Sequence, residues 1–158
     1  MSANPPAAEL VNQPVAWCRA QWRERLALTP LDGGETFQVV DRIEKEQVPN
    51  LRQHRGIYVD LIQGVNTGRM RDRVTAEMQE QVRVVILWHV NPKAQQASQE
   101  AAENAGDAVT QWVTDDRAWH GEWNVKIVSQ RRDRHPVSAE WYVVEHTYTM
   151  RRYARVGG

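Results

Sequence analysis

The sequence predicts an α+β fold in which two helices pack on one face of an antiparallel sheet of four to five strands. Three observations predict this class. The stretch Val82 to Val90 is apolar on both alternating faces, as in a strand at the centre of a covered sheet. An alanine-rich segment with helical periodicity follows it directly. The full order of helix, weak strand, strand, long strand, helix, strand, strand is typical of an antiparallel sheet with helices on one side.

Length and composition restrict the classes of protein further. A chain of 158 residues favours one domain with a real core, spanning residues 1–158. Its 20 basic and 20 acidic side chains cancel, which argues against a protein that grips nucleic acid over its whole surface. One cysteine, Cys18, excludes an intrachain disulfide. No apolar run approaches the roughly 20 residues of a membrane span, so we expect no membrane partner.

The first half of the chain begins with a small, polar, proline-bearing segment, residues 1–13, that we expect to be a flexible arm. Apolar side chains at helical spacing then predict a helix from Pro14 to Leu28. A weak edge strand is predicted within Glu35 to Ile43, and a clearer strand within Ile57 to Gln63. Between them, the charged stretch Glu44 to Gly56 is expected to be a connecting loop.

The stretch before the central strand contains a second alternation. Val65 to Gln81 reads first as a loop, but the alternation of Val82 to Val90 continues upstream to Val74. Seventeen residues at about 3.4 Å each span roughly 60 Å, well beyond a usual strand. This length predicts a projecting β-hairpin over Asn66 to Gln81. The competing interpretation is a short helix over Asp72 to Gln81, which contains good helix formers.

The second half has the clearest helix, predicted from Lys93 to Thr114 by a stripe of alanine and valine. A strand is predicted over Trp123 to Gln130, a basic turn over Arg131 to Pro136, and a last strand over Ala139 to Met150. Basic residues follow this strand, and residues 154–158 are expected to form a C-terminal tail.

No motif predicts catalysis. Four histidines (His89, His120, His135 and His146) lack the spacing of known metal-binding motifs. The densest polar cluster contains Asp115, Asp116, His120 and Glu122, and we expect it to be a solvated loop. No glycine pattern of a phosphate-binding loop and no nucleophile elbow is present. We therefore expect no catalytic residues, no metal and no cofactor, and the protein is not predicted to be an enzyme.

The residues that carry a family resemblance are spread along the chain from about Val15 to Tyr153. The N-terminal helix leads through a proline-containing stretch to a strand, VPNLRQHRGIYVDLI, and a charged hairpin follows. Then come the apolar strand VRVVILWHV, the alanine-rich helix that ends in Trp112-Val113, and two strands that end in YVVEHTYTMRRYAR. In this order and texture the chain resembles the tail terminator, or tail-completion, proteins of long-tailed bacteriophages.

The resemblance implies a non-enzymatic structural protein of the virion, assembled in the host cytoplasm. It implies a ring, usually of six copies, that caps the head-proximal end of the tail tube and stops its polymerisation. The implied partners are further copies of the chain, the tail tube protein, the sheath protein as a further partner, and the head–tail connector or neck proteins. Genome DNA would pass through the lumen without sequence-specific contacts. Other neck or head-completion rings share this texture.

Candidate interface residues lie in the predicted hairpin, the basic turn and the last strand. Their basic groups suit acidic partner surfaces or the DNA in the lumen. We expect the interface to include Arg69, Arg71, Arg73, Val74, Met78, Arg131, Arg132, Arg134, Arg151 and Arg152.

The alternative function is a nucleic-acid-binding module. It would use the two basic segments for phosphates and Tyr142 and Tyr148 for stacking on bases. Solvated ends of the last pair of strands explain the same basic residues without any ligand.

Overall fold

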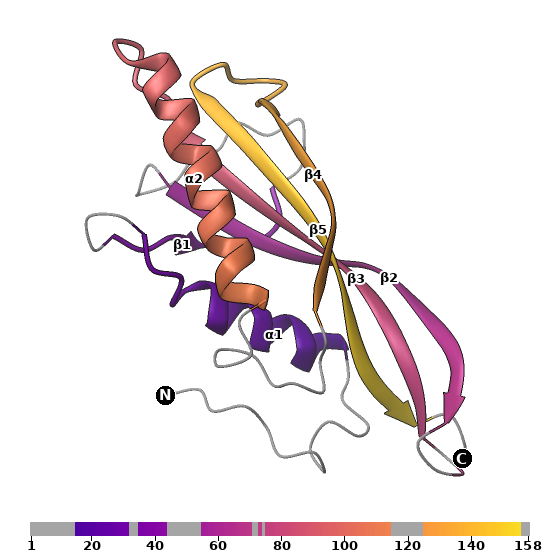
Figure 1. Ribbon diagram of the computed structural model, residues 1–158. Helices are drawn as coiled ribbons and strands as arrows, with labels where there is room; N and C mark the ends of the chain where they lie inside the picture. Colours follow the sequence, from indigo (N-terminus) through magenta and orange to yellow (C-terminus); the bar gives the residue numbers. More distant parts are fainter. Residues whose placement is uncertain are drawn as a thin grey trace.

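The computed structural model describes residues 15–31, 35–43, 55–70, 73, 75–114 and 125–155. Two helices and five strands lie in these ranges (Figure 1). In chain order they are α1 (Val15–Leu26), β1 (Gln38–Val39), β2 (Arg55–Met70), β3 (Thr75–His89), α2 (Gln95–Thr114), β4 (Lys126–Arg134) and β5 (Trp141–Arg155). The predicted α+β class is confirmed.

The five strands form one sheet in the order β1-β2-β3-β5-β4. The four long strands pair antiparallel, as predicted. The short β1 pairs parallel to β2, with Gln38 opposite Gly56, so the sheet as a whole is mixed. The stretch Val82 to Val90 supplies most of β3, which is the middle strand. Apolar side chains of β3 are buried on both faces, in the main core on one side and in a smaller cluster on the other, and the prediction of a central strand is confirmed.

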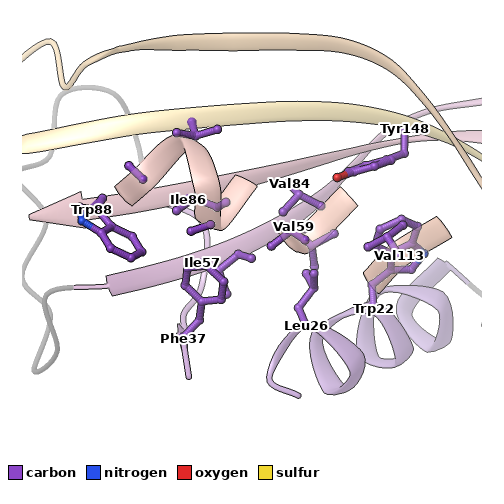
Figure 2. Close-up of a cluster of buried hydrophobic side chains, with 14 of the residues drawn as sticks. Trp22, Leu26, Phe37, Ile57, Val59, Val84, Ile86, Trp88, Val113 and Tyr148 are labelled. Carbon is purple, nitrogen blue, oxygen red and sulfur yellow. The ribbon is translucent and has the colours of Figure 1, made fainter. Parts of the chain in front are cut away.

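Both helices pack on the same face of the sheet, where the main core lies (Figure 2). On β3 this face carries Val82, Val84, Ile86 and Trp88, all less than a tenth exposed. Helix α2 meets them with a stripe of small side chains, which lets its backbone lie close to the strands. That stripe consists of Ala102, Ala105, Gly106, Val109 and Val113.

Helix α2 comes closest to the sheet at Gly106, beside β5. A Cβ placed on Gly106 would lie 3.0 Å from Cγ1 of Val144 and 3.1 Å from the imidazole of His146. Both of these side chains are buried, so they have little room to move. Glycine is therefore the residue that allows α2 and β5 to approach to this distance.

Helix α1 is tied to both α2 and the sheet through tryptophan. The indole N–H of Trp22, which is fully buried, donates to the sulfur of Met150 on β5 at 2.8 Å. Its ring also lies 5.8 Å from that of Tyr148, centroid to centroid. From α2, the indole of Trp112 donates to the carbonyl of Arg25 at 3.0 Å. These contacts join the two helices and β5 in one core.

Beyond the helices, the sheet continues as a narrow extension of three strands (Figure 1). Strand β3 pairs with β2 as far as Ala76, opposite Met70, and with β5 as far as Thr75, opposite Arg155. The prediction that the central strand starts near Val74 is thus close to the observed start. The competing interpretation, a short helix over Asp72 to Gln81, is wrong, because residues 75–81 belong to β3.

Three other sequence predictions need correction. Residues 64–70, expected in a loop or hairpin turn, extend β2, and β5 makes the extension three-stranded where a two-stranded hairpin was expected. Strand β4 starts at Lys126 and runs to Arg134, so most of the predicted basic turn is strand. Strand β5 runs to Arg155, which includes part of the predicted tail. Residues 1–13 and 156–158 lie outside the described ranges.

Candidate functional site

The face of the sheet opposite the helices holds the most distinctive group of side chains. A second, smaller buried cluster lies here, formed by Tyr58, Val85, Leu87 and Trp141. Val40 and Ile43, from the segment after β1, cover part of it, together with Val143 of β5. Among the described residues, neither helix contributes to this cluster. We call this surface the helix-free face.

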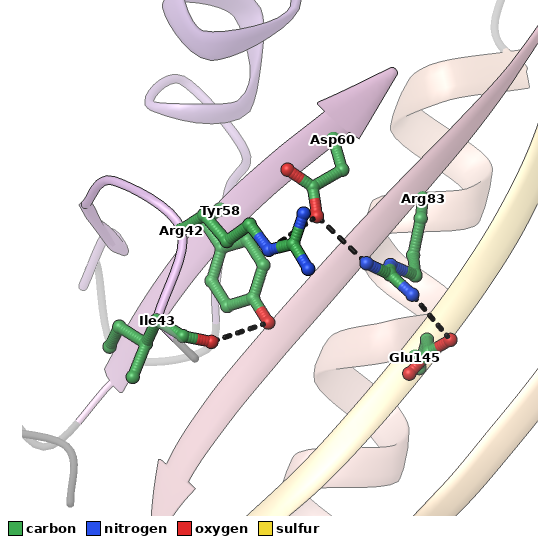
Figure 3. A network of polar contacts seen from close by, with 6 residues as sticks. All are labelled: Arg42, Ile43, Tyr58, Asp60, Arg83 and Glu145. Atoms are coloured by element: carbon green, nitrogen blue, oxygen red, sulfur yellow. Dashed lines mark hydrogen bonds and ion pairs between the residues drawn. The ribbon is translucent and has the colours of Figure 1, made fainter. Parts of the chain in front are cut away.

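Charged side chains cross this face in a row from strand to strand (Figure 3). Arg83 of β3 lies between two carboxylates, with Nη2 at 2.9 Å from Oδ2 of Asp60 on β2 and Nη1 at 3.9 Å from Oε1 of Glu145 on β5. Nε of Arg42 lies 3.7 Å from the same oxygen of Asp60. We call Arg42, Asp60, Arg83 and Glu145 the ionic row. It joins three strands and the segment after β1.

Partial burial of Asp60, Arg83 and Glu145 makes their interactions stronger than those of a fully exposed ion pair. The hydrogen bond that Arg83 donates to Asp60, followed by the nearby charge of Glu145, raises the pKa of Arg83 above its usual value despite the opposing effect of burial. Burial raises the pKa of Tyr58, whose hydroxyl donates to the carbonyl oxygen of Ile43 at 3.5 Å. Arg83 therefore stays charged and Tyr58 stays neutral at physiological pH.

A cavity of about 400 Å³ lies over the ionic row and the smaller cluster. Its floor is apolar, formed by Val85, Leu87 and Val143. One side is formed by the segment after β1 and the other by β4 and the turn that follows it. Thirteen residues line it: Arg42, Ile43, Tyr58, Arg83, Val85, Leu87, Arg131, Asp133, Arg134, His135, Pro136, Val143 and Glu145.

A second polar cluster is buried under α2, on the opposite face. The hydroxyl of Thr110 lies 3.0 Å from Nδ1 of His146 and 3.0 Å from the hydroxyl of Tyr148, and those two groups are 3.1 Å apart. Burial lowers the pKa of His146 and raises that of Tyr148, so both are neutral near pH 7. His146 and Tyr148 are at most 1% exposed, which leaves no path for a substrate. This cluster holds the helix on the sheet.

The predicted interface residues fall into two groups. One group lies at the outer end of the sheet: Arg69 and Arg73 are exposed there, Met78 is half-buried, and Arg151 lies 3.7 Å from Glu77. The other group, Arg131, Arg132 and Arg134, is exposed on β4. The main chain of Arg152 lies in β5 opposite Met78. Arg71 and Val74 lie outside the described residues.

The polar residues that the sequence analysis considered for metals are not gathered into a site. His89 packs edge-on against Trp141, His135 is buried at the cavity and His146 is buried under α2. Residues 115–124, which contain the remaining acidic cluster, lie outside the described ranges. Within the described ranges, no group of three or more His, Cys, Asp or Glu side chains could hold a metal ion.

The ionic row was not predicted from the sequence. Asp60, Arg83 and Glu145 each occupy an apolar-looking strand, in IYVDLI, VRVV and YVVEHT. By the alternation along each strand, the side chains of all three point to the helix-free face. A single charged residue that points to this face of a strand is ordinary. Opposite charges that point to the same face on three adjacent strands indicate a row of ion pairs across the strands. That signal requires the strand order, which the sequence did not supply.

No protein-family model matches the chain, and a search of curated protein sequences gives no match. In the described part of the chain, neither helix has the length and apolar character needed to cross a membrane.

Proposed function

We propose that the protein is a structural assembly protein of a phage neck or tail, which forms a ring at the head-proximal end of the tail tube. In this role it stops tube polymerisation and docks the tail to the head connector. Its partners are further copies of itself, the tube protein and the connector, with the sheath protein in contractile tails. No step of this function requires catalysis or a cofactor.

The observation that carries the proposal is the three-stranded extension. Strands β2, β3 and β5 each run for 15 or 16 residues, against a usual strand of about 5 or 6. Their outer halves extend past both helices (Figure 1), so much of this length adds little to the core of a single chain. A long sheet of this kind is useful when it lies against another molecule.

Exposed apolar side chains on the extension support the same proposal. Ile62, Val65 and Met70 lie on the outer part of β2, and each is about half exposed. Beyond Ile57, β2 pairs only with β3 in the described part of the chain, so its outer edge is open there. Large apolar side chains beside an open strand edge are a common feature of protein interfaces. A neighbouring subunit is the partner that suits this edge best.

Native mass spectrometry of the purified protein tests this proposal. We expect a closed oligomer of one size, with six copies as the predicted number. The variant Val65→Lys places a charge on the exposed edge and should shift the population to monomer. Val128→Lys, which changes an equally exposed valine on β4, is the matched control and should keep the oligomer. A monomer at all concentrations, with no binding to tail tubes, would count against the ring.

Nucleic-acid binding remains the second candidate on one observation. Arg131, Arg132 and Arg134 are all exposed on the edge strand β4. The two tyrosines expected to stack on bases are buried, Tyr142 at 8% and Tyr148 at 0% exposure. The arginines are therefore exposed for binding phosphates, whereas the two tyrosines are too buried to stack on bases. Retention on heparin that falls steeply with added salt would favour this candidate, and no retention would remove it.

A further inference from the structure

The cavity on the helix-free face has an apolar floor and polar ends. Val85 and Leu87 of β3 are nearly fully buried at its base, and Val143 of β5 is half-buried beside them. Tyr58 and Ile43 border one side, and His135 and Pro136 border the other. A volume of about 400 Å³ falls within the range of sites that bind small organic molecules. The floor has no polar group, so the body of a ligand bound there must be apolar.

Hydrogen-bond donors exceed acceptors around this floor. The carboxylates of Asp60 and Glu145 are already engaged by Arg83, as Figure 3 shows. The carboxylate of Asp133 accepts the backbone N–H of Arg134 at 2.7 Å. Nε–H of Arg83, by contrast, is buried without a hydrogen-bond partner in the described part of the chain. The nearby acidic groups thus have partners, while a guanidinium donor at the cavity does not.

Arg131 adds the strongest donor group at the edge of the cavity. It is exposed on β4, and neither an ion pair nor a side-chain hydrogen bond joins it to another described residue. It lies opposite Glu145 in the sheet register, which places its side chain on the helix-free face. Arg134 also borders the cavity, but its guanidinium donates to Gln95 of α2 at 3.0 Å. Arg131 is therefore the cation available to a ligand.

His135 supplies one more donor. Its Nδ1 accepts the backbone N–H groups of Val137 and Ser138, each at 3.2 Å. The proton of the neutral ring must then be on Nε2. Burial lowers the pKa of His135, so the neutral form prevails at pH 7. The imidazole thus offers a donor and no further acceptor.

We propose that this cavity binds a small amphipathic anion, with an aromatic or aliphatic body on the apolar floor and a carboxylate or sulfonate group at Arg131. The anionic oxygens accept hydrogen bonds from the guanidinium, whose forked N–H groups can reach two oxygens of a carboxylate or sulfonate at once. The body lies between Tyr58 and Pro136 and covers Val143. This site does not depend on ring formation and stands on the geometry of one chain.

Fluorescence titration with 8-anilinonaphthalene-1-sulfonate tests the site directly on the folded, full-length protein. This dye joins an aromatic body to a sulfonate. We expect saturable binding with a stoichiometry of one per chain. The Arg131→Gln variant should bind it about tenfold more weakly, because a charge-assisted hydrogen bond is lost.

Arg132→Gln is the matched control. Arg132 is the adjacent, equally exposed arginine, but it lies opposite Val144 on the helix-covered side of the sheet. Its loss should leave the dye affinity unchanged. N-phenyl-1-naphthylamine, which keeps the aromatic body without the sulfonate, should bind both variants and the unmodified protein equally and more weakly than the anionic dye. Equal affinities of all three proteins for the anionic dye, or equal affinities for the two dyes, would overturn the proposal.

Discussion

Replacing Arg83 with glutamine should destabilise the fold far more than replacing other arginines of the same face. Arg83 bridges Asp60 and Glu145, and its removal leaves both carboxylates without this cation on a partly buried surface. Losing one partner of a buried ion pair costs about 3–5 kcal/mol, whereas a fully exposed pair is worth less than about 1 kcal/mol. The side chains of Arg83 and Asp60 are 22% and 13% exposed, so they resemble the buried case more closely.

The remaining contact with Arg42 reduces this cost. Arg42 stays 3.7 Å from Asp60 and can partly neutralise it after Arg83 is lost. We therefore expect Arg83→Gln to lower the free energy of unfolding by about 2 kcal/mol, below the range for an uncompensated buried charge. Urea unfolding at pH 7 measures this as a lower midpoint with an unchanged slope.

Arg131→Gln supplies the control for this prediction, since Arg131 is on the same face but makes no ion pair with a described residue. Its effect should stay within about 0.5 kcal/mol. A cycle with Asp60→Asn should give a coupling energy of about 1 kcal/mol or more between Asp60 and Arg83. If Arg83→Gln costs no more than Arg131→Gln and the coupling is near zero, the ionic row does not stabilise the sheet.

Three further predictions concern acid stability, the helix contact and the extension. Burial lowers the pKa of His146 and His135 in the folded chain. As pH drops below about 6.5, these histidines bind protons more readily in the unfolded chain than in the folded one, so the free energy of unfolding should fall. His146→Gln should make that fall shallower in urea unfolding between pH 7 and pH 5. Gly106→Leu should cost about 2 kcal/mol or more in thermal unfolding, because no space exists beside β5, whereas Asn104→Leu on the exposed side of α2 should cost much less. Ile62→Lys should reduce self-association but leave the unfolding midpoint unchanged at a protein concentration too low for assembly, and a lower midpoint under that condition would mean that Ile62 stabilises the single chain.

The central strand and the long helix could be predicted because their patterns are local. Alternation from Val74 to Val90 anticipated most of β3, and the alanine stripe anticipated α2 with an end at Thr114. Burial on both faces of β3 followed from apolar residues at both phases, as at Val84 and Val85. These features depend on neighbouring residues in the chain, which the sequence displays directly.

Strand lengths and strand partners were harder to predict. Gly64, Asn66 and Gly68 disfavour strand, yet β2 continues through them because β3 supplies a pairing edge over that length. The arginines of β4 suggested a turn, but an edge strand exposed on both faces tolerates charge well. In both strands, pairing with a neighbouring strand outweighs the low strand propensity of the local sequence.

The candidate site depends on strand order and so could not be predicted. Asp60 and Arg83 are 23 positions apart in the chain, and Glu145 is far from both. They meet because β3 lies between β2 and β5, an order that the sequence did not reveal. His135 was considered as a metal ligand, and its place at an apolar cavity became clear only from the turn after β4.

The most direct test of the proposed function is electron microscopy of purified phage tail tubes incubated with the purified protein. We predict a ring of extra density at one end only of each tube, with no further tube growth from that end when tube protein is added. Tubes without a terminal ring, which keep growing from both ends in the presence of the protein, would contradict the account.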